Sequence, residues 1–144
     1  MKGVIEKIRA FPEKGKPGKD LAEGRFTENQ GLEGDFHADR GDRQISLLFA
    51  EIRELLESSK EKGYCFSRFK ENVSIRGMSP AITMTGMRIT AGEVILEITR
   101  EVKNCHDECF IFKAGKRCPL AGQNLFARVA KGGIMRAGDR VESC

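Results

Sequence analysis

Three cysteines and a histidine crowd into one stretch of this chain, residues 99–119. Cys105, Cys109 and Cys118 lie there beside His106, although the whole chain holds only five cysteines and two histidines. A cysteine thiolate is both a nucleophile and a soft metal ligand, so the crowding has three explanations. One thiol is chemically active, or the group holds a structural zinc ion, or the cysteines are small apolar residues packed in a core.

The spacing favours an active thiol over zinc. Zinc would require Cys105 and its direct neighbour His106 to turn toward one ion, whereas structural sites space paired ligands two to four residues apart. The neighbours of Cys109 and Cys118 are apolar or proline, which predicts that these two cysteines are buried. Structural zinc stays open as the alternative.

Cys105 is the best candidate for the reactive thiol and for a metal ligand. It follows an apolar strand-like run, residues 93–99, so the strand would anchor a loop that carries the thiol. Arg100, Lys103 and His106 surround it in sequence, and positive charge nearby favours the thiolate.

A second polar cluster occupies residues 31–44, where two glycines three apart precede a dense set of acids and bases. Asp35 and His37 would share one side of an extended chain, so the carboxylate could hold the imidazole tautomer for a ligand. The alternative is a surface loop whose charges neutralise one another. For a pocket-lining loop, we expect Asp35→Ala or Arg43→Ala to reduce ligand binding and to change stability by no more than about 1 kcal/mol.

Composition predicts one globular domain, residues 1–144. Hydrophobic residues make up 40% and charged residues 32% of the chain, which is typical of a folded domain. No apolar run is long enough to span a membrane, and the charged N-terminus does not resemble a signal peptide, so we predict a cytoplasmic protein with reduced thiols. The net charge of +4 is spread along the chain and tryptophan is absent, which argues against a nucleic-acid partner.

Short alternating segments separated by glycine turns predict a mostly β fold, a β-barrel with a few peripheral short helices. In the run 93–99, Val94, Leu96 and Ile98 would form the inward face. Apolar spacing predicts helices at residues 49–61 and 123–131. The predicted strands are an edge strand at 2–11, strands at 44–48, 69–77, 87–90 and 93–99, and a last strand after the turn at residues 137–139.

Several blocks in this order resemble the MOSC domain, the module found at the C-terminus of molybdenum cofactor sulfurases and as small stand-alone proteins. The blocks are GLEGDFHA, DRQISLL, ENVSIRG, TGMRITAGEVILEITR and FARVAKGGIMRAGDRVE, with a cysteine after the fourth. The resemblance covers residues 1–143, and the Cys-His-x-x-Cys at 105–109 is similar to the compact stand-alone branch.

The resemblance implies a β-barrel and a role in sulfur transfer or in the chemistry of the molybdenum cofactor (molybdopterin). It places the family cysteine, which carries sulfur or ligates molybdenum, at Cys105. Basic side chains would meet the phosphate of the pterin. The residues that the resemblance places near the cofactor are Asp35, His37, Arg43, Gln44, Glu71 and Asn72. Arg100 and Lys103 are, with Arg43, the basic residues that we expect to bind the phosphate.

Whether the protein is an enzyme stays open at this point. A sulfur carrier of 144 residues has no room for a pyridoxal-binding domain, so a cysteine desulfurase-type partner would supply the sulfur and molybdoenzymes would receive it. The alternatives are a non-catalytic module that binds the cofactor or sulfur, a structural zinc-binding β domain, and a molybdenum-dependent reductase of N-hydroxylated compounds that takes electrons from a partner.

Overall fold

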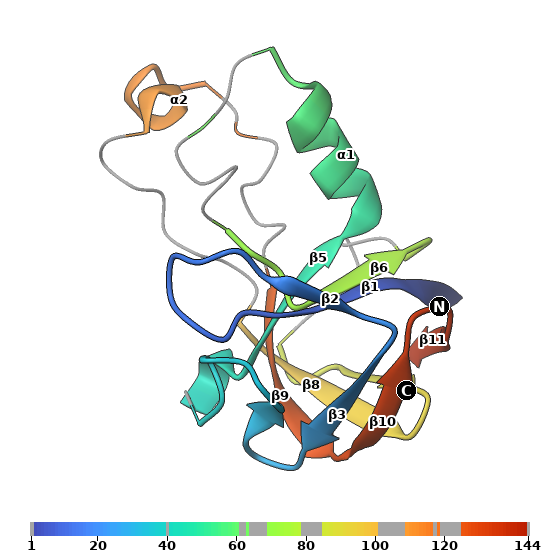
Figure 1. Cartoon of the computed structure of the whole chain (residues 1–144). Coiled ribbons are helices and arrows are strands. Elements are labelled where there is room, and N and C mark those ends of the chain that lie inside the picture. Colours follow the sequence, from blue (N-terminus) through green and yellow to red (C-terminus); the bar gives the residue numbers. More distant parts are fainter. Residues whose placement is uncertain are drawn as a thin grey trace.

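The computed structural model describes residues 2–39, 41–60, 63, 69–78, 85–100, 109–116, 118 and 125–143. Figure 1 shows two helices at one end of a curved sheet and the strands β3 and β10 toward the other end. The strands are β1 (Lys2–Ala10), β2 (Lys19–Leu21), β3 (Glu23–Thr27), β4 (Gly31–Leu32), β5 (Ile45–Phe49), β6 (Val73–Arg76), β7 (Arg88–Ala91), β8 (Val94–Arg100), β9 (Leu125–Lys131), β10 (Gly133–Arg136) and β11 (Arg140–Ser143). The helices are the 3-10 turn η1 (Gly41–Arg43), α1 (Ala50–Ser58) and the single turn α2 (Phe110–Lys113).

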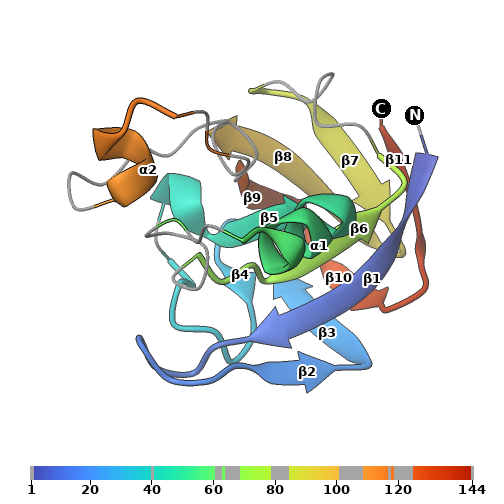
Figure 2. The same ribbon diagram turned by 90° about the horizontal axis from the view of Figure 1, so that it is seen from above.

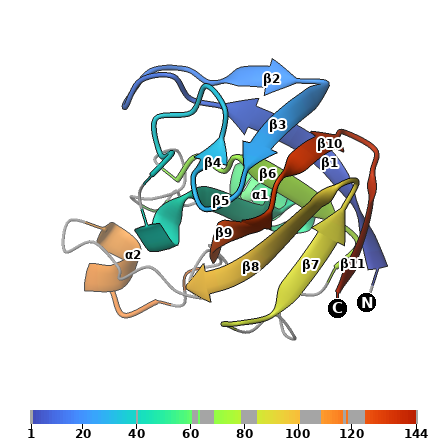
Figure 3. The same ribbon diagram turned by 90° about the horizontal axis from the view of Figure 1, so that it is seen from below.

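The described strands close into a barrel, which confirms the predicted fold class. Its seven strands follow the order β11-β7-β8-β9-β5-β6-β1, and pairing of β1 with β11 completes the ring (Figure 2). All of these pairs are antiparallel except β5 with β6, which are parallel. Helix α1 lies in the connection between these two strands. Strand β2 extends the sheet beyond β1, and β3 lies between β4 and β10 in a separate small sheet (Figure 3).

The predicted helix at residues 123–131 is wrong, because residues 125–131 form strand β9. Leu125, Ala127 and Val129 point into the barrel, while Phe126 belongs to an apolar cluster outside it. A short apolar run fits either a helical or a strand period, and only the neighbours decide. Here β8 and β5 supply hydrogen-bonding partners on both sides of β9.

The predicted edge strand at the start of the chain is also wrong, because β1 has partners along both sides. Its first residues pair with β11, its middle with β6 and its last residues with β2. The alternating charges of β1 suggested an edge, but Ile5 and Ile8 are each only 1% exposed. Exposed charges on one face of a strand report the solvent side of a sheet, and they say nothing about whether its edges are paired.

The predicted helix at residues 49–61 is confirmed as α1, which begins at Ala50 and ends at Ser58. It buries Ala50 and Leu56, and it follows β5 directly. The predicted strand at 69–77 is shorter than expected, since β6 begins only at Val73. Within the described residues, no helix has both the length and the apolar character that crossing a membrane requires.

Two apolar clusters stabilise the described fold. The larger fills the barrel, and Val94, Leu96 and Ile98 contribute to it as predicted. The smaller lies outside the barrel wall and joins α1, α2 and the outer sides of β5 and β9. Cys109 is buried in this second cluster and the half-buried Cys118 packs against it, so the prediction of burial is confirmed for Cys109 and holds in part for Cys118. The members of the second cluster are Leu48, Leu56, Phe69, Cys109, Ile111 and Phe126.

Candidate functional site

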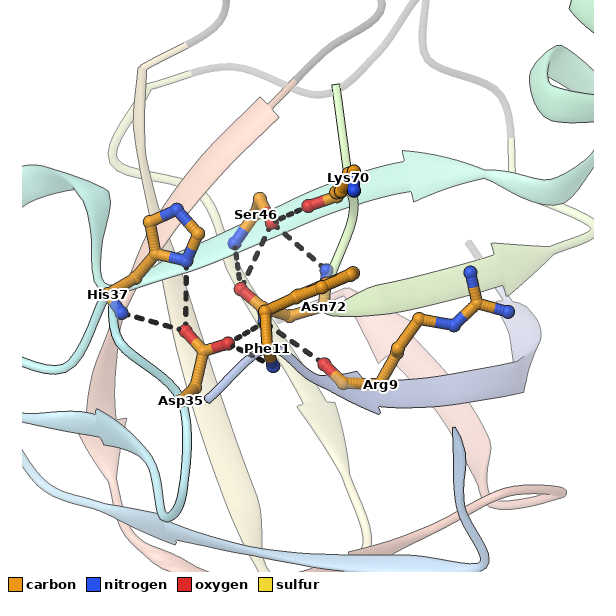
Figure 4. Close-up of polar contacts among 7 residues, drawn as sticks. All are labelled: Arg9, Phe11, Asp35, His37, Ser46, Lys70 and Asn72. Carbon is orange, nitrogen blue, oxygen red and sulfur yellow. Dashed lines mark hydrogen bonds and ion pairs between the residues drawn. The ribbon is translucent and has the colours of Figure 1, made fainter. Parts of the chain in front are cut away.

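A buried carboxylate, Asp35, lies at the centre of a polar network at one end of the barrel (Figure 4). Its Oδ1 accepts hydrogen bonds from the backbone N–H of Phe11 at 2.8 Å and from Nδ2 of Asn72 at 2.9 Å. Its Oδ2 accepts the backbone N–H of His37 at 3.0 Å and lies 2.9 Å from His37 Nδ1. Four donors therefore surround one carboxylate whose side chain is 0% exposed.

Asn72 extends the network to β5. Its Nδ2 also donates to the carbonyl oxygen of Arg9 at 3.0 Å, and its Oδ1 accepts the backbone N–H of Ser46 at 3.0 Å. The hydroxyl of Ser46 lies 3.0 Å from that same Oδ1 and 3.0 Å from the carbonyl oxygen of Lys70. The orientation of the Asn72 amide is thereby determined, because its oxygen faces donors and its nitrogen faces acceptors.

The network joins four segments that are distant in sequence: the end of β1, the turn after β4, strand β5 and the residues before β6. The turn after β4 has no long strand ladder of its own. Asp35 hydrogen-bonds to its own turn through the backbone of Leu32 and Ala38, and to the rest of the protein through its side chain. These side-chain hydrogen bonds, together with the backbone hydrogen bond from Phe36 N–H to the carbonyl oxygen of Phe11 at 2.8 Å, position His37.

Asp35 is ionised at neutral pH. Burial alone would raise the pKa of its carboxyl, but hydrogen bonds donated by His37 and by the backbone N–H groups of Phe11 and His37 outweigh burial, so that the pKa lies below its ordinary value. A carboxylate that accepts several N–H donors is favoured in its charged form for this reason.

His37 is held by two contacts. Its side chain meets Asp35 as predicted, but the two residues lie in a turn and not in an extended chain. Its Nδ1 faces the Asp35 carboxylate, and its ring stacks on Phe36 with 3.9 Å between ring centroids. The His37 side chain is 26% exposed. An ionised carboxylate accepts only, so Nδ1 carries the hydrogen in the neutral imidazole, and Nε2 is left with its lone pair.

Arg43 and Gln44 are adjacent in sequence and differ in environment. Gln44 is buried, and its Oε1 accepts the backbone N–H of Val129 at 3.1 Å, so it fixes η1 to β9. Arg43 is exposed, and its guanidinium carbon lies 5.1 Å from the centroid of the Phe126 ring. Of this pair, only Arg43 presents a charged group to the outside.

Glu71 belongs to a different region, a polar cleft of about 640 Å³ between β1, α1 and the residues before β6. The two carboxylate oxygens of Glu71 accept from Arg53 at 2.7 and 3.1 Å, and Arg53 also donates to the carbonyl oxygen of Phe69. The cleft shares Arg9, Phe11 and Lys70 with the network around Asp35. Asp35, His37, Arg43 and Gln44 do not line it. Glu71 therefore holds α1 against the residues before β6.

Strand β8, which leads into the segment of the predicted thiol, ends opposite Phe126. Cys105, Lys103 and His106 lie outside the described residues, and only the backbone of Arg100 is described. Arg100 is the last residue of β8 and pairs with Phe126, the ring on which Arg43 stacks. Within the described part of the chain, no three His, Cys, Asp or Glu side chains converge as a metal site, and the zinc alternative at Cys105 and His106 stays a prediction.

Sequence reasoning did not include Phe11, Ser46 or Arg53 among the site residues. Ser46 offered a usable signal, since it is a single hydroxyl inside the otherwise apolar strand Ile45–Phe49 and must find a hydrogen-bond partner when buried. Phe11 takes part through its backbone, which side-chain chemistry does not reveal. Arg53 resembled any other solvent-facing residue of a helix.

The burial of Asp35 corrects one expectation. A change within about 1 kcal/mol is typical of surface substitutions, and Asp35 is not a surface residue. Asp35→Ala would leave four donors without their acceptor, each of them costly when buried. The expectation still applies to Arg43, which is exposed.

These observations define the class of the fold and its site, which is a closed seven-stranded barrel with a polar network at one end. No protein-family model and no curated protein matches the chain. Solved structures do match, at low sequence identity. The YuaD protein from Bacillus subtilis superimposes with a TM-score of 0.71 at 18% identity, over 99% of this chain and 96% of that one.

YiiM from Escherichia coli matches with a TM-score of 0.61 at 21% identity, covering 100% of this chain and 70% of that one. YiiM from Geobacillus stearothermophilus gives 0.60 at 14% identity, over 99% and 73%. Since YiiM is a MOSC-domain protein, the fold of this chain is MOSC-like. At these identities the likeness concerns the fold.

Proposed function

We propose that this protein is a molybdenum-cofactor-associated member of the MOSC family, in which the Cys105 thiol ligates molybdenum or carries sulfur destined for molybdoenzymes. The observation that supports this most is the MOSC-like fold across the whole length of the chain, since the match to YiiM from Escherichia coli covers 100% of it. The sequence blocks that resemble the family support the same proposal.

The described residues fit such a ligand in part, and they divide into two groups. Arg43 is exposed and would bind an anionic group such as the pterin phosphate, and His37 offers a ring nitrogen. Asp35, Gln44, Glu71 and Asn72 already use their polar atoms within the protein, so we assign them the role of positioning. Arg100 and Lys103 remain proposed phosphate contacts, and the cofactor would supply a redox-active metal centre.

Sulfur, in this proposal, comes from a cysteine desulfurase-type donor. The donor would pass sulfur to the Cys105 thiolate, and a molybdoenzyme would accept it or the loaded cofactor. A reductase of N-hydroxylated compounds is the second candidate, and it needs the same thiol as a metal ligand together with an electron-donating partner.

The experiment uses protein purified from a host that makes the cofactor. We expect molybdenum, or a persulfide on Cys105 seen as a mass increase, in the wild-type protein and in Cys109→Ala. The control keeps the second apolar cluster apolar, because Cys109 is buried there. Cys105→Ser is expected to abolish loading.

Loading of Cys105→Ser at the wild-type level would refute the proposal. One equivalent of zinc, lost together with the fold on chelation, would establish the structural zinc alternative instead. Molybdenum in the wild-type protein together with turnover of an N-hydroxylated compound would favour the reductase.

A further inference from the structure

We propose that His37 is the proton acceptor of this site, with Nε2 taking the proton from a thiol that binds at this end of the barrel and Asp35 acting as the positioning residue. The inference deepens the proposed function and rests on it, because sulfur chemistry supplies the thiol. It concerns the ring nitrogen that faces away from Asp35 in Figure 4.

The tautomer of His37 follows from the neighbours of Asp35. Every group within hydrogen-bond distance of the carboxylate is a donor: two backbone N–H groups, the Asn72 amide and His37 Nδ1. The carboxylate therefore has no reason to hold a proton, and Nδ1 must donate to it. The Nε2 lone pair is thereby available to a ligand. In a histidine free in solution, the tautomer that leaves this lone pair available is the less populated one.

The ring is also fixed in place. Oδ2 of Asp35 accepts both the backbone N–H and Nδ1 of His37, so backbone and ring are fixed by the same oxygen. Phe36 stacks on one side of the ring. Asp35 cannot move, since Phe11 and Asn72 hold its other oxygen. A base whose position is set in advance needs little rearrangement when the ligand binds.

The proton step balances within the site. The S–H bond of the sulfur-accepting thiol breaks, its electron pair stays on sulfur, and the proton forms a new bond to Nε2. The imidazolium that results lies beside the ionised Asp35, whose negative charge offsets the new positive one. The thiolate then attacks the outer sulfur of a persulfide donor, the S–S bond of the donor breaks, and the donor leaves as a thiolate that takes the proton back from Nε2. The Asp35 side chain has no exposed surface, whereas the His37 side chain is 26% exposed. A ligand can therefore reach the imidazole while the carboxylate beside it stays shielded from water.

A purely structural role would use Nδ1 alone, because among the described residues only Nδ1 joins the ring to the network. Two substitutions separate the roles. His37→Asn retains a donor close to the position of Nδ1 and loses the acceptor at Nε2. His37→Gln places a polar group near Nε2 and loses the short donor to Asp35.

The first measurement is the tautomer, read from the ¹⁵N chemical shifts of the imidazole nitrogens in the full chain. The two histidines give few signals, and His37→Asn assigns them. We expect hydrogen on Nδ1 of His37 in the wild-type protein and in Glu33→Gln, a control that removes an exposed carboxylate of the same turn. Asp35→Asn is expected to shift the population toward hydrogen on Nε2. A wild-type ring with hydrogen on Nε2 would overturn the proposal.

The second measurement is the rate at which sulfur is loaded from a small persulfide donor, followed by mass. We expect His37→Asn to slow loading by about 100-fold, the lower end of what a positioned general base contributes, with an unchanged unfolding midpoint. An unchanged rate in His37→Asn overturns the role of His37 and leaves the proposed function standing. Loading that persists in Cys105→Ser refutes the proposed function itself, so the two failures are distinguishable.

Discussion

Two polar regions of this barrel contain the same residue types and differ in what surrounds them. Around Asp35, a fully buried carboxylate accepts hydrogen bonds from three separate segments. On the barrel wall, Glu97 lies 3.2 Å from Arg88 and 2.9 Å from Arg128, with 23% of its side chain exposed. Water can replace the partners of Glu97, whereas nothing can replace those of Asp35.

The difference concerns which part of the fold depends on each carboxylate. The strands that carry Arg88, Glu97 and Arg128 are β7, β8 and β9, and backbone hydrogen bonds hold these strands together whatever their side chains do. The turn after β4 lacks such ladders. The backbone hydrogen bond from Phe36 N–H to the carbonyl oxygen of Phe11 and the hydrogen bonds of the Asp35 side chain fix it to the end of β1 and to Asn72. A buried hydrogen bond that loses its partner costs more than an exposed ion pair contributes, so stability should respond very differently in the two regions.

The comparison is tested most severely at Asn72, which is 0% exposed. Asn72→Asp would place a carboxylate oxygen where Nδ2 now donates to Asp35, so that two negative charges meet in a buried place. We expect a loss of about 3 to 5 kcal/mol in the free energy of unfolding, the range for an uncompensated buried charge. Urea unfolding measures it.

Asn29→Asp is the matched control, because it makes the same chemical change on an exposed turn next to Arg128. It should change stability by less than about 0.5 kcal/mol. Similar losses in both variants would remove the distinction between the two regions.

A second prediction sharpens the comparison through pH. The pKa of Asp35 is lowered in the folded protein, so its contribution is complete above the ordinary carboxyl pKa of about 4 and is lost as pH falls through the lower folded value. Asp35→Asn meets four donors whichever way its amide turns, and it should cost about 1 to 3 kcal/mol at pH 7. The difference in unfolding free energy between wild type and variant should shrink at pH 3. A difference that stays constant between pH 7 and pH 3 would mean that the charge of Asp35 is not what stabilises the turn.

The smallest effect is expected at the barrel wall. Hydrogen bonds from Arg128 and then Arg88 lower the pKa of Glu97, yet all three side chains are partly exposed. Glu97→Gln should cost less than about 1 kcal/mol and should lose most of its effect in high salt. Denaturation in low and high salt checks this, and a loss that salt does not reduce would count against it.

Much of the barrel could be predicted from the sequence, because alternation reports which side of a strand is buried. Residues 94–98 show this, since every second side chain enters the core. Pairing partners could not be predicted in the same way. The helix expected at residues 123–131 became β9 because β5 and β8 lie on either side of it, and those neighbours come from distant parts of the chain.

The candidate site divides along the same line. Asp35 and His37 are two residues apart, so their contact is local. It forms in a turn, where the aspartate accepts the backbone N–H two residues further on, and not in the extended chain expected from the sequence. The contact of Asp35 with Asn72 spans 37 residues and requires the parallel pairing of β5 with β6. For the same reason, reading residue types alone grouped Glu71 with Asn72, although their side chains turn to different regions.

The closing pair of the barrel has a consequence for how the chain reaches its folded state. Lys2 pairs with Glu142, so the first and last strands are neighbours, and Figure 1 shows the two ends close together. The ring cannot close until almost every residue is available, and contacts between such distant residues are slow to form. A circular permutant that joins these ends and opens the chain at an exposed turn, such as the one around Gly15, would convert the last contact into a local one. Such a permutant should fold faster than the natural order of strands.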